Sequence, residues 1–215
     1  MNILALDLTS EYGSLAVVHD EQVLASQELH STEGFAHIIF GAIERVLEEA
    51  QVGLSEIDCY AAAAGPGAFT GVRVGLAAVK GLAEAEGKLG IGVSNLQAVA
   101  ACGHGRLRAP ILDARRGDVF AAIYDAELQV VEPETVGRLE HFLERAGGGD
   151  VEFLSQNVDW LQPQMTKPVS AAPRYLAKAV AHCARLAIER GAAGDPAALD
   201  ANYVRRSDAE LYWRE

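Results

Sequence analysis

Residues 2–24, NILALDLTSEYGSLAVVHDEQVL, decide the fold class, because residues 109–131, APILDARRGDVFAAIYDAELQVV, repeat their layout. In each stretch an apolar strand ends in Asp, a tight turn contains Gly, a second strand ends in Asp, and a third strand follows. The aligned pairs are Asp7 with Asp113, Gly13 with Gly117, and Asp20 with Asp125. A match of this length can arise by chance, but a β-unit that recurs later in the chain indicates two similar lobes.

The first of these stretches is followed by a predicted helix over residues 31–50, with Ser31 or Thr32 as its N-cap. The apolar residues of this helix spread over roughly 200° of its surface, about twice the width of a one-sided apolar stripe. Such a helix has two apolar neighbours. We expect one to be its own sheet and the other to be a lobe or another chain.

Residues 64–75, AGPGAFTGVRVG, join a predicted strand to a helix predicted from Thr70 to Glu86. A glycine-rich turn in this place either binds phosphate or lets two backbones touch. The stretch lacks the Lys-Ser/Thr pair of a phosphate-binding P-loop and the glycine spacing of a dinucleotide site. It therefore favours a tight structural turn, with anion binding as the alternative. Gly71, Gly75 and Ala78 gather on one side of the helix, where we expect another helix or strand to approach closely.

The net charge of −12 restricts the partners of the isolated chain. Such a chain would repel a phosphate backbone, so a role on nucleic acid requires a basic partner. The three cysteines are widely separated and have no metal-like spacing, which is typical of reduced thiols in a cytoplasmic protein. No apolar segment reaches membrane-spanning length, so we expect no association with a membrane.

Asp7 and Asp113, at strand ends, are candidates for holding a metal-bound nucleotide, as carboxylates do in two-lobed ATPases. Such enzymes place a glycine and hydroxyls directly after the first Asp, whereas this chain has Leu8 and then Thr9. The favoured interpretation is that both carboxylates cap hairpins, and a nucleotide site at Asp7, Thr9 and Asp113 would be degenerate. We assign no catalytic residue, metal ligand or cofactor, because no histidine pair or Ser-His-Asp arrangement has informative spacing.

Five stretches taken together resemble a known family. They are ILALDLTSE, GPGAFTGVRVG, GVSNLQA, LDARRGDVF and ANYVRR. In this order and at similar spacing they resemble the bacterial TsaB (YeaZ) family of tRNA threonylcarbamoyladenosine biosynthesis proteins, with Ala68 where Ser is commoner. The resemblance implies an α/β fold of the actin-like, Hsp70-like (ASKHA) kind, built of two RNase-H-like lobes with mixed sheets flanked by helices. Residues 1–100 would form the N-terminal lobe, which carries the partner-binding helices, and residues 101–215 the C-terminal lobe, with a tail that packs back on the first.

The resemblance also implies a function. Members of this family act as non-catalytic partners that activate the catalytic subunit TsaD, together with the ATPase TsaE. The complex transfers a threonylcarbamoyl group to the adenosine beside the anticodon of tRNAs that read codons starting with A, and tRNA would be reached only through the complex. The first two helices of the N-terminal lobe would pair with TsaD or, in its absence, with a second copy of the chain. The candidate contacts are Phe35, Ile39, Ile43, Gly71, Val72, Gly75, Leu76 and Val79.

Two rival interpretations remain open. One is an enzyme, either a small actin-like ATPase or kinase, or a peptidase. It would require a glycine after Asp7 and a second phosphate loop, or paired histidines, and the sequence has neither. The other is a self-contained homodimeric scaffold that stays paired with itself when a catalytic subunit is offered.

Overall fold

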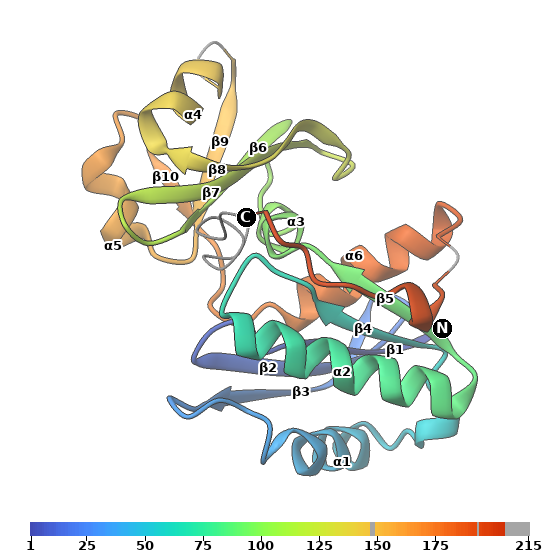
Figure 1. Ribbon diagram of the computed structural model, residues 1–215. Helices are drawn as coiled ribbons and strands as arrows, with labels where there is room; N and C mark the ends of the chain where they lie inside the picture. Colours follow the sequence, from blue (N-terminus) through green and yellow to red (C-terminus); the bar gives the residue numbers. More distant parts are fainter. Residues whose placement is uncertain (147–148, 193, 205–215) are drawn as a thin grey trace, which may run out of the picture. The chain divides into compact units, whose positions relative to one another are not determined.

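The computed structural model describes residues 1–146, 149–192 and 194–204 (Figure 1). The chain divides into two compact units. Unit 1 comprises Met1–Ala98 and Arg174–Ala201, and unit 2 comprises Val99–Pro173 together with the residues from Asn202 on. Each unit contains one five-stranded sheet.

The sheet of unit 1 has the order β3-β2-β1-β4-β5. Its strands are β1 (Asn2–Asp7), β2 (Tyr12–His19), β3 (Gln22–His30), β4 (Cys59–Ala63) and β5 (Leu89–Val93). The first three strands pair antiparallel as a meander, whereas β4 and β5 run parallel to β1. Strands β1 and β4 are almost wholly buried, because helices cover both faces of the sheet.

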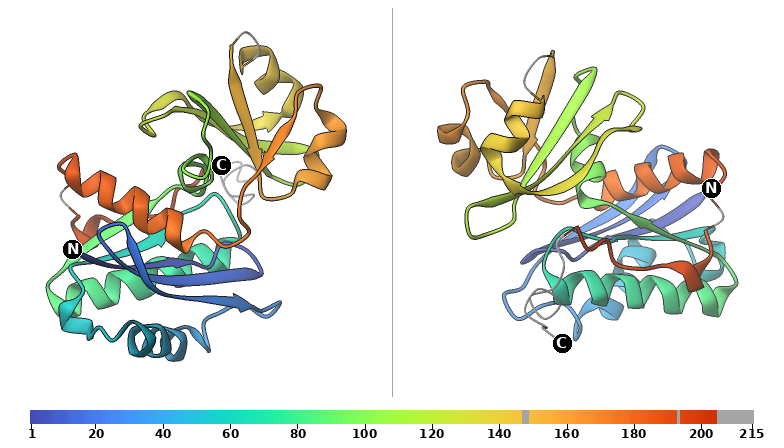
Figure 2. Two further views of the ribbon diagram at one scale, coloured as in Figure 1. Left: turned by 180° about the vertical axis from the view of Figure 1, so that it is seen from behind. Right: turned by 45° about the horizontal axis from the view of Figure 1, so that its top comes forward.

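Three helices cover this sheet (Figure 2). Helices α1 (Ile39–Ala50) and α2 (Phe69–Glu86) lie on one face and share a hydrophobic core with the strands. Helix α6 (Ala177–Glu189) lies on the other face, where the N–H of Ala177 donates to the Ser14 hydroxyl at 3.0 Å. The short helices are η1 (Leu54–Glu56), η3 (Pro196–Ala198) and α3 (Asn95–Ala100), and α3 leads toward unit 2.

The sheet of unit 2 has the order β10-β9-β6-β7-β8. Its strands are β6 (Leu107–Asp113), β7 (Asp118–Asp125), β8 (Val130–Arg138), β9 (Val151–Ser155) and β10 (Val169–Ala171). Its helices are α4 (Leu139–Ala146), α5 (Val158–Leu161) and η2 (Gln162–Gln164). A separate apolar cluster, centred on residues such as Ile111, Phe142 and Phe153, forms the core of this unit.

The two sheets have the same topology, which confirms the repeated β-unit. When β6 to β10 are matched in order with β1 to β5, the strand orders agree, and so do the antiparallel and parallel pairings. Asp7 and Asp113 end the first strand of each sheet. The glycine pair is not equivalent, because Gly13 lies within β2 whereas Gly117 lies in the β6–β7 turn at φ +79.

Two expectations about unit 1 need correction. Helix α1 begins at Ile39 rather than Ser31. Gly34 has a left-handed backbone at φ +87, and the Ser31 hydroxyl donates to its carbonyl oxygen at 2.8 Å, so this segment folds into turns. The observed division falls between Ala98 and Val99, and residues 174–201 belong to unit 1, because α6 packs on β1, β2, β4 and β5.

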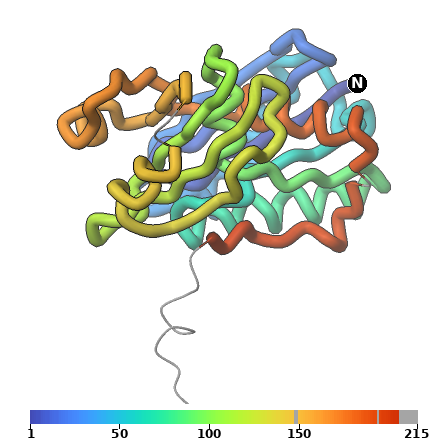
Figure 3. Tube along the Cα trace, turned by 90° about the horizontal axis from the view of Figure 1, so that it is seen from above, coloured from blue at the N-terminus to red at the C-terminus, as the bar shows by residue number. Residues whose placement is uncertain are grey.

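The segment after α6, residues 194–201, covers the edge of β5 and runs along α2 (Figure 3). The N–H of Gly90 donates to the carbonyl oxygen of Gly194 at 2.8 Å, and Lys80 Nζ donates to that of Ala197 at 2.9 Å. A Cβ at Gly90 would lie 3.0 Å from Leu199, so this glycine makes room for the segment. The tail expected from the sequence comprises residues 200–215, of which residues 205–215 lie outside the described part of the chain.

Within the described parts of the chain, no helix combines the length and the apolar character that crossing a membrane requires.

Candidate functional site

The carboxyl end of β1 carries a closed network of buried polar groups. Asp7 is 2% exposed, and its Oδ1 accepts hydrogen bonds from the Thr9 N–H at 3.0 Å and the Thr9 hydroxyl at 2.6 Å. Asn95 Nδ2 donates to the Thr9 hydroxyl at 2.6 Å. Asn95 also joins Gly65, through Oδ1 to its N–H at 3.0 Å and through its own N–H to the Gly65 carbonyl at 2.8 Å. The network therefore ties β1 to the β4–α2 loop and to the start of α3.

The environment of Asp7 disfavours its charged form. Burial raises the pKa of Asp7 above its ordinary value of 3.8. Hydrogen bonds from Thr9, from the Asn95 side chain and from the N–H of Leu176 act in the opposite direction and only partly offset this effect. A carboxyl group enclosed and engaged in this way is a structural hub rather than an open ligand for a metal or nucleotide.

The β4–α2 loop presses its backbone against the loop that follows β1. A Cβ at Gly71 would overlap the Leu8 carbonyl oxygen, and one at Gly67 would lie 2.6 Å from the Thr9 Cβ. The Ala68 N–H donates to the Thr9 carbonyl oxygen at 2.7 Å. The glycines of GPGAFTG thus permit a close approach of two backbones, as the favoured interpretation of the sequence predicts. The peptide bond between Gly65 and Pro66 is cis.

The third nucleotide candidate, Asp113, lies in unit 2. Its Oδ1 accepts the N–H of Arg115 at 2.7 Å, and its Oδ2 lies 3.5 Å from the Arg115 guanidinium. This carboxylate stabilises the β6–β7 turn, which agrees with its interpretation as a hairpin cap. Of the three nucleotide candidates, Asp7 and Thr9 are in contact in unit 1. Asp113 occupies the position equivalent to Asp7 in unit 2.

The eight candidate interface residues are not surface residues, which corrects their selection. Seven are buried in unit 1 and Gly71 is half-buried against Leu8; the seven are Phe35, Ile39, Ile43, Val72, Gly75, Leu76 and Val79. The apolar ones fill the core between the sheet and helices α1 and α2. The sequence shows which side chains are apolar. It does not show which of them face the sheet, because the start of α1 was predicted too early and the position of the sheet is not known from sequence.

Two aromatic side chains on the same helices are exposed instead. Phe40, on α1, is 58% exposed, and Phe69, at the start of α2, is 50% exposed. The Arg73 guanidinium lies 3.7 Å from the centre of the Phe69 ring, a cation–π contact. Ala77 and Gly81 extend the exposed surface of α2 with small residues. Phe40 lies about 100° around the helix from its buried neighbour Ile39, at the margin of the buried stripe, and the sequence alone does not distinguish these two apolar neighbours.

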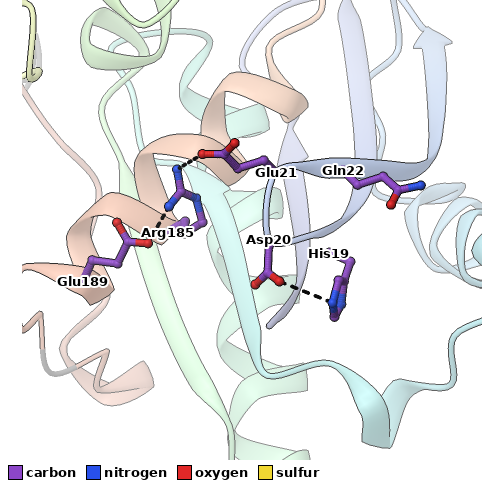
Figure 4. Close-up of a pocket in the computed structure, with 6 residues that line it drawn as sticks. All are labelled: His19, Asp20, Glu21, Gln22, Arg185 and Glu189. Atoms are coloured by element: carbon purple, nitrogen blue, oxygen red, sulfur yellow. Dashed lines mark hydrogen bonds and ion pairs between the residues drawn. The ribbon is translucent and has the colours of Figure 1, made fainter.

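A second polar feature of unit 1 is a pocket between the β2–β3 turn and α6 (Figure 4). Asp20 pairs with the amino group of Met1 at 2.8 Å, and His19 Nε2 lies 3.3 Å from Asp20 Oδ2. The amino group of Met1 lowers the pKa of Asp20, through a hydrogen bond first and its charge second. Arg185 bridges Glu21, at 3.0 Å, and Glu189. The charges of the pocket are therefore largely paired with one another.

Among the residues that the structure describes, no three His, Cys, Asp or Glu side chains gather in a way that would hold a metal ion.

Comparison with known proteins identifies the family. The family model described as TsaD: tRNA N6-adenosine threonylcarbamoyltransferase matches residues 22–188. The tRNA threonylcarbamoyladenosine biosynthesis protein TsaB of Bacillus subtilis is 29% identical over 228 residues, covering 100% of this chain and 99% of that protein. TsaB of Escherichia coli is 33% identical over 169 residues, covering 74% of this chain and 72% of that protein. The chain belongs to the TsaB branch of the TsaD family.

The fold of this TsaB-family chain agrees with solved structures. YeaZ from Pseudomonas aeruginosa is similar with a TM-score of 0.80 and 25% identity, covering 94% of this chain and 99% of that one. A second structure, described as an uncharacterized protein with similarity to peptidase YEAZ from Pseudomonas aeruginosa, gives the same TM-score at 26% identity. The resemblance to the TsaB (YeaZ) family and the expected actin-like fold of two RNase-H-like lobes are both confirmed.

Proposed function

We propose that this chain is a non-catalytic subunit that activates a TsaD-like catalytic subunit in the synthesis of threonylcarbamoyladenosine in tRNA. The complex would also contain a TsaE-like ATPase and would modify the adenosine beside the anticodon of tRNAs that read codons starting with A. Membership of the TsaB branch, whose relatives are named for this biosynthesis, supports the pathway. The state of the β1 end supports the non-catalytic role.

The single observation that carries the non-catalytic role is the closure around Asp7. In a two-lobed ATPase the carboxylate at this strand end and the loop after it must face the nucleotide. Here Asp7 is buried and held by Thr9, and the Gly71 backbone occupies the space beside the Leu8 carbonyl. A phosphate could reach these groups only if the β4–α2 loop moved away.

The exposed aromatic surface of α1 and α2 supports the partner role. Two large, half-exposed rings on neighbouring helices are the kind of anchor that dominates protein interfaces. Small residues such as Ala77 and Gly81 would let a partner helix approach the α2 backbone closely. We therefore transfer the proposed contact from the buried candidates to Phe40 and Phe69. With no catalytic subunit present, the same surface would pair two copies of the chain.

The net charge of −12 is consistent with a subunit that does not grip tRNA by itself. In the proposed complex the catalytic subunit supplies most of the contacts with the phosphate backbone.

Size-exclusion chromatography with light scattering tests the partner role. The chain alone should elute as a homodimer, and addition of a TsaD-like subunit should convert it to a heterodimer. Phe69→Ser and Phe40→Ser should each weaken both assemblies by roughly 30-fold, since losing a buried aromatic anchor costs about 2 kcal/mol. Val130→Ser is the matched control, because Val130 is 58% exposed on unit 2 and should leave assembly unchanged. A homodimer that persists beside an unbound TsaD-like subunit would contradict the proposal.

A further inference from the structure

Unit 2 contains a small pocket that the proposed function does not use. It lies between strands β7 and β8 and helix α4 and has a volume of about 100 Å³. Val119, Val136 and Phe142 supply an apolar floor, and Arg138, His141 and Arg145 line it with nitrogen donors. The pocket thus combines enclosure with cationic side chains, the combination that oxyanion sites require.

Several arginines lie close together at this pocket, although the chain as a whole is acidic. Unit 2 carries more acidic than basic residues, as the whole chain does. Nevertheless Arg138 and Arg145 line one pocket, and Arg115 and Arg116 lie in the β6–β7 turn next to it. The link is direct, because Arg138 Nη1 donates to the carbonyl oxygens of Gly117 at 3.1 Å and Arg116 at 3.4 Å.

Arg138 and Arg145 each lie near a carboxylate, but at a distance longer than a hydrogen bond. Arg138 Nε lies 3.6 Å from Asp118 Oδ1, and Arg145 Nε lies 3.6 Å from Glu132 Oε2. At these distances the two ion pairs orient the guanidinium groups without a hydrogen bond, so N–H donors remain for short, charge-assisted hydrogen bonds to an oxyanion. Arg145 also lies over the ring of Phe142, with Cζ 5.9 Å from its centre. That contact keeps the side chain beside the pocket floor.

The neighbouring turn is held in an uncommon conformation. Arg115, Arg116 and Gly117 have φ values of +63, +57 and +79. A left-handed backbone at a residue other than glycine costs roughly 1–2 kcal/mol, so the two arginines need compensation. Asp113, which accepts the Arg115 N–H, and Arg138 supply it. The turn that carries both arginines is thereby held in one conformation and is tied to the pocket through Arg138.

From these observations we propose that the pocket of Arg138, His141 and Arg145 binds a phosphate group. Its volume is about three times the share of liquid volume that one water occupies, which suits a single tetrahedral oxyanion. The guanidinium forks and the imidazole offer donors of the type that phosphate prefers. The proposal goes beyond the proposed function, because it concerns the isolated chain and holds whether or not a catalytic subunit binds.

A titration of the isolated chain with inorganic phosphate, followed by NMR of backbone amides, tests the site. We expect saturable shifts at residues 117–119 and 136–145. Arg145→Gln should weaken binding at least about tenfold, since it removes a fork that contacts the anion. This variant should fold, because the contacts of Arg145 with described residues are the ion pair with Glu132 and the contact with the Phe142 ring. Arg138→Gln, which also removes hydrogen bonds to the β6–β7 turn, serves as the second variant. Arg106→Gln is the control: Arg106 is exposed on the same unit and carries the same charge.

Two further titrations identify the source of the phosphate. Adenosine monophosphate presents a free phosphate, and an RNA oligonucleotide without terminal phosphates presents only a backbone. Whichever ligand produces the same shifts, and loses them in Arg145→Gln, is the source. Shifts spread over the surface without saturation, or equal weakening by Arg145→Gln and Arg106→Gln, would overturn the proposal.

Discussion

Gly71 and Gly81 lie on the same helix, α2, in opposite surroundings. A Cβ at Gly71 would overlap the Leu8 carbonyl oxygen, which is backbone and cannot turn aside, whereas a Cβ at Gly81 meets no atom within 4 Å. We expect Gly71→Ala to lower the free energy of unfolding by roughly 1–3 kcal/mol or more through overpacking. Gly81→Ala should raise it by about 1 kcal/mol through helix propensity.

Urea denaturation of the two variants, made in the Phe69→Ser chain so that the proposed self-pairing does not contribute, measures both effects. The opposite signs are the test, because the chemical change is the same. If Gly71→Ala were as stable as Gly81→Ala, the close contact between the β4–α2 loop and the loop after β1 would be wrong.

Asp7 and Asp20 provide a second matched pair at this scale. Burial raises the pKa of Asp7 above 3.8, and the Met1 amino group lowers the pKa of Asp20 below it. The pKa of Asp7 is therefore higher in the folded chain than in the unfolded chain, and protonated Asp7 stabilises the fold. This stabilisation is complete below pH 3.8, the ordinary value, and is lost as the pH rises through the pKa of the folded chain. For Asp20 the ionised form stabilises the fold. This stabilisation is present above pH 3.8 and is lost as the pH falls through the pKa of Asp20 in the folded chain.

Carboxyl ¹³C NMR during a pH titration reads both groups in one sample. We expect the Asp7 midpoint above 3.8 and the Asp20 midpoint below it. An Asp7 midpoint at or below 3.8 would mean that the hydrogen bonds to the carboxylate outweigh its burial, and the conclusion that its surroundings disfavour the charged form would be wrong.

At the scale of elements, the segment of residues 194–201 explains two glycines of β5. Gly90 and Gly92 leave room for Leu199, and the Gly90 N–H donates to Gly194. We expect Leu199→Ala to lower the free energy of unfolding by about 1 kcal/mol, because Leu199 is only half-buried. It should also speed hydrogen exchange of the Gly90 amide. Val131→Ala, on exposed β8, should change neither, and unchanged Gly90 exchange in Leu199→Ala would contradict the covering role.

Most of the strands and α2 could be predicted from sequence, because apolar runs between turn residues identify them without tertiary information, whereas the three-residue strand β10 is too short to give such a run. The repeat around Asp7 and Asp113 even predicts the shared topology of the two sheets. The start of α1 could not be predicted. Gly34 and Ser31 favour turns, but this signal is weak beside the helical pattern of apolar residues that follows. Whether Phe40 or Ile39 is buried depends on the position of the sheet. Without that position, the sequence does not distinguish two neighbouring apolar residues on one helix.

The return of α6 to unit 1 was beyond sequence reasoning for a similar reason. A buried helix such as Ala177–Glu189 carries no mark of which sheet it covers. The network of Asp7, Thr9 and Asn95 joins residues far apart in the chain. Local spacing indicates Asp7 and Thr9 as a pair, but it gives no sign of Asn95.

At the scale of the whole molecule, the central claim is that the chain activates a catalytic subunit and performs no chemistry itself. The closed Asp7 network predicts little or no binding of ATP with Mg²⁺ to the isolated chain, measured by calorimetry. Tight binding would revive the interpretation as an actin-like ATPase.

Reconstitution of tRNA modification tests the claim most directly. A TsaD-like subunit, a TsaE-like ATPase, a threonylcarbamoyl adenylate and tRNA are combined with and without this chain, and the modified adenosine is quantified. The account predicts that the chain alone forms no product, that the mixture without it is nearly inactive, and that adding it restores formation of threonylcarbamoyladenosine. Product formed by the chain alone, or an equal yield in its absence, would contradict the account.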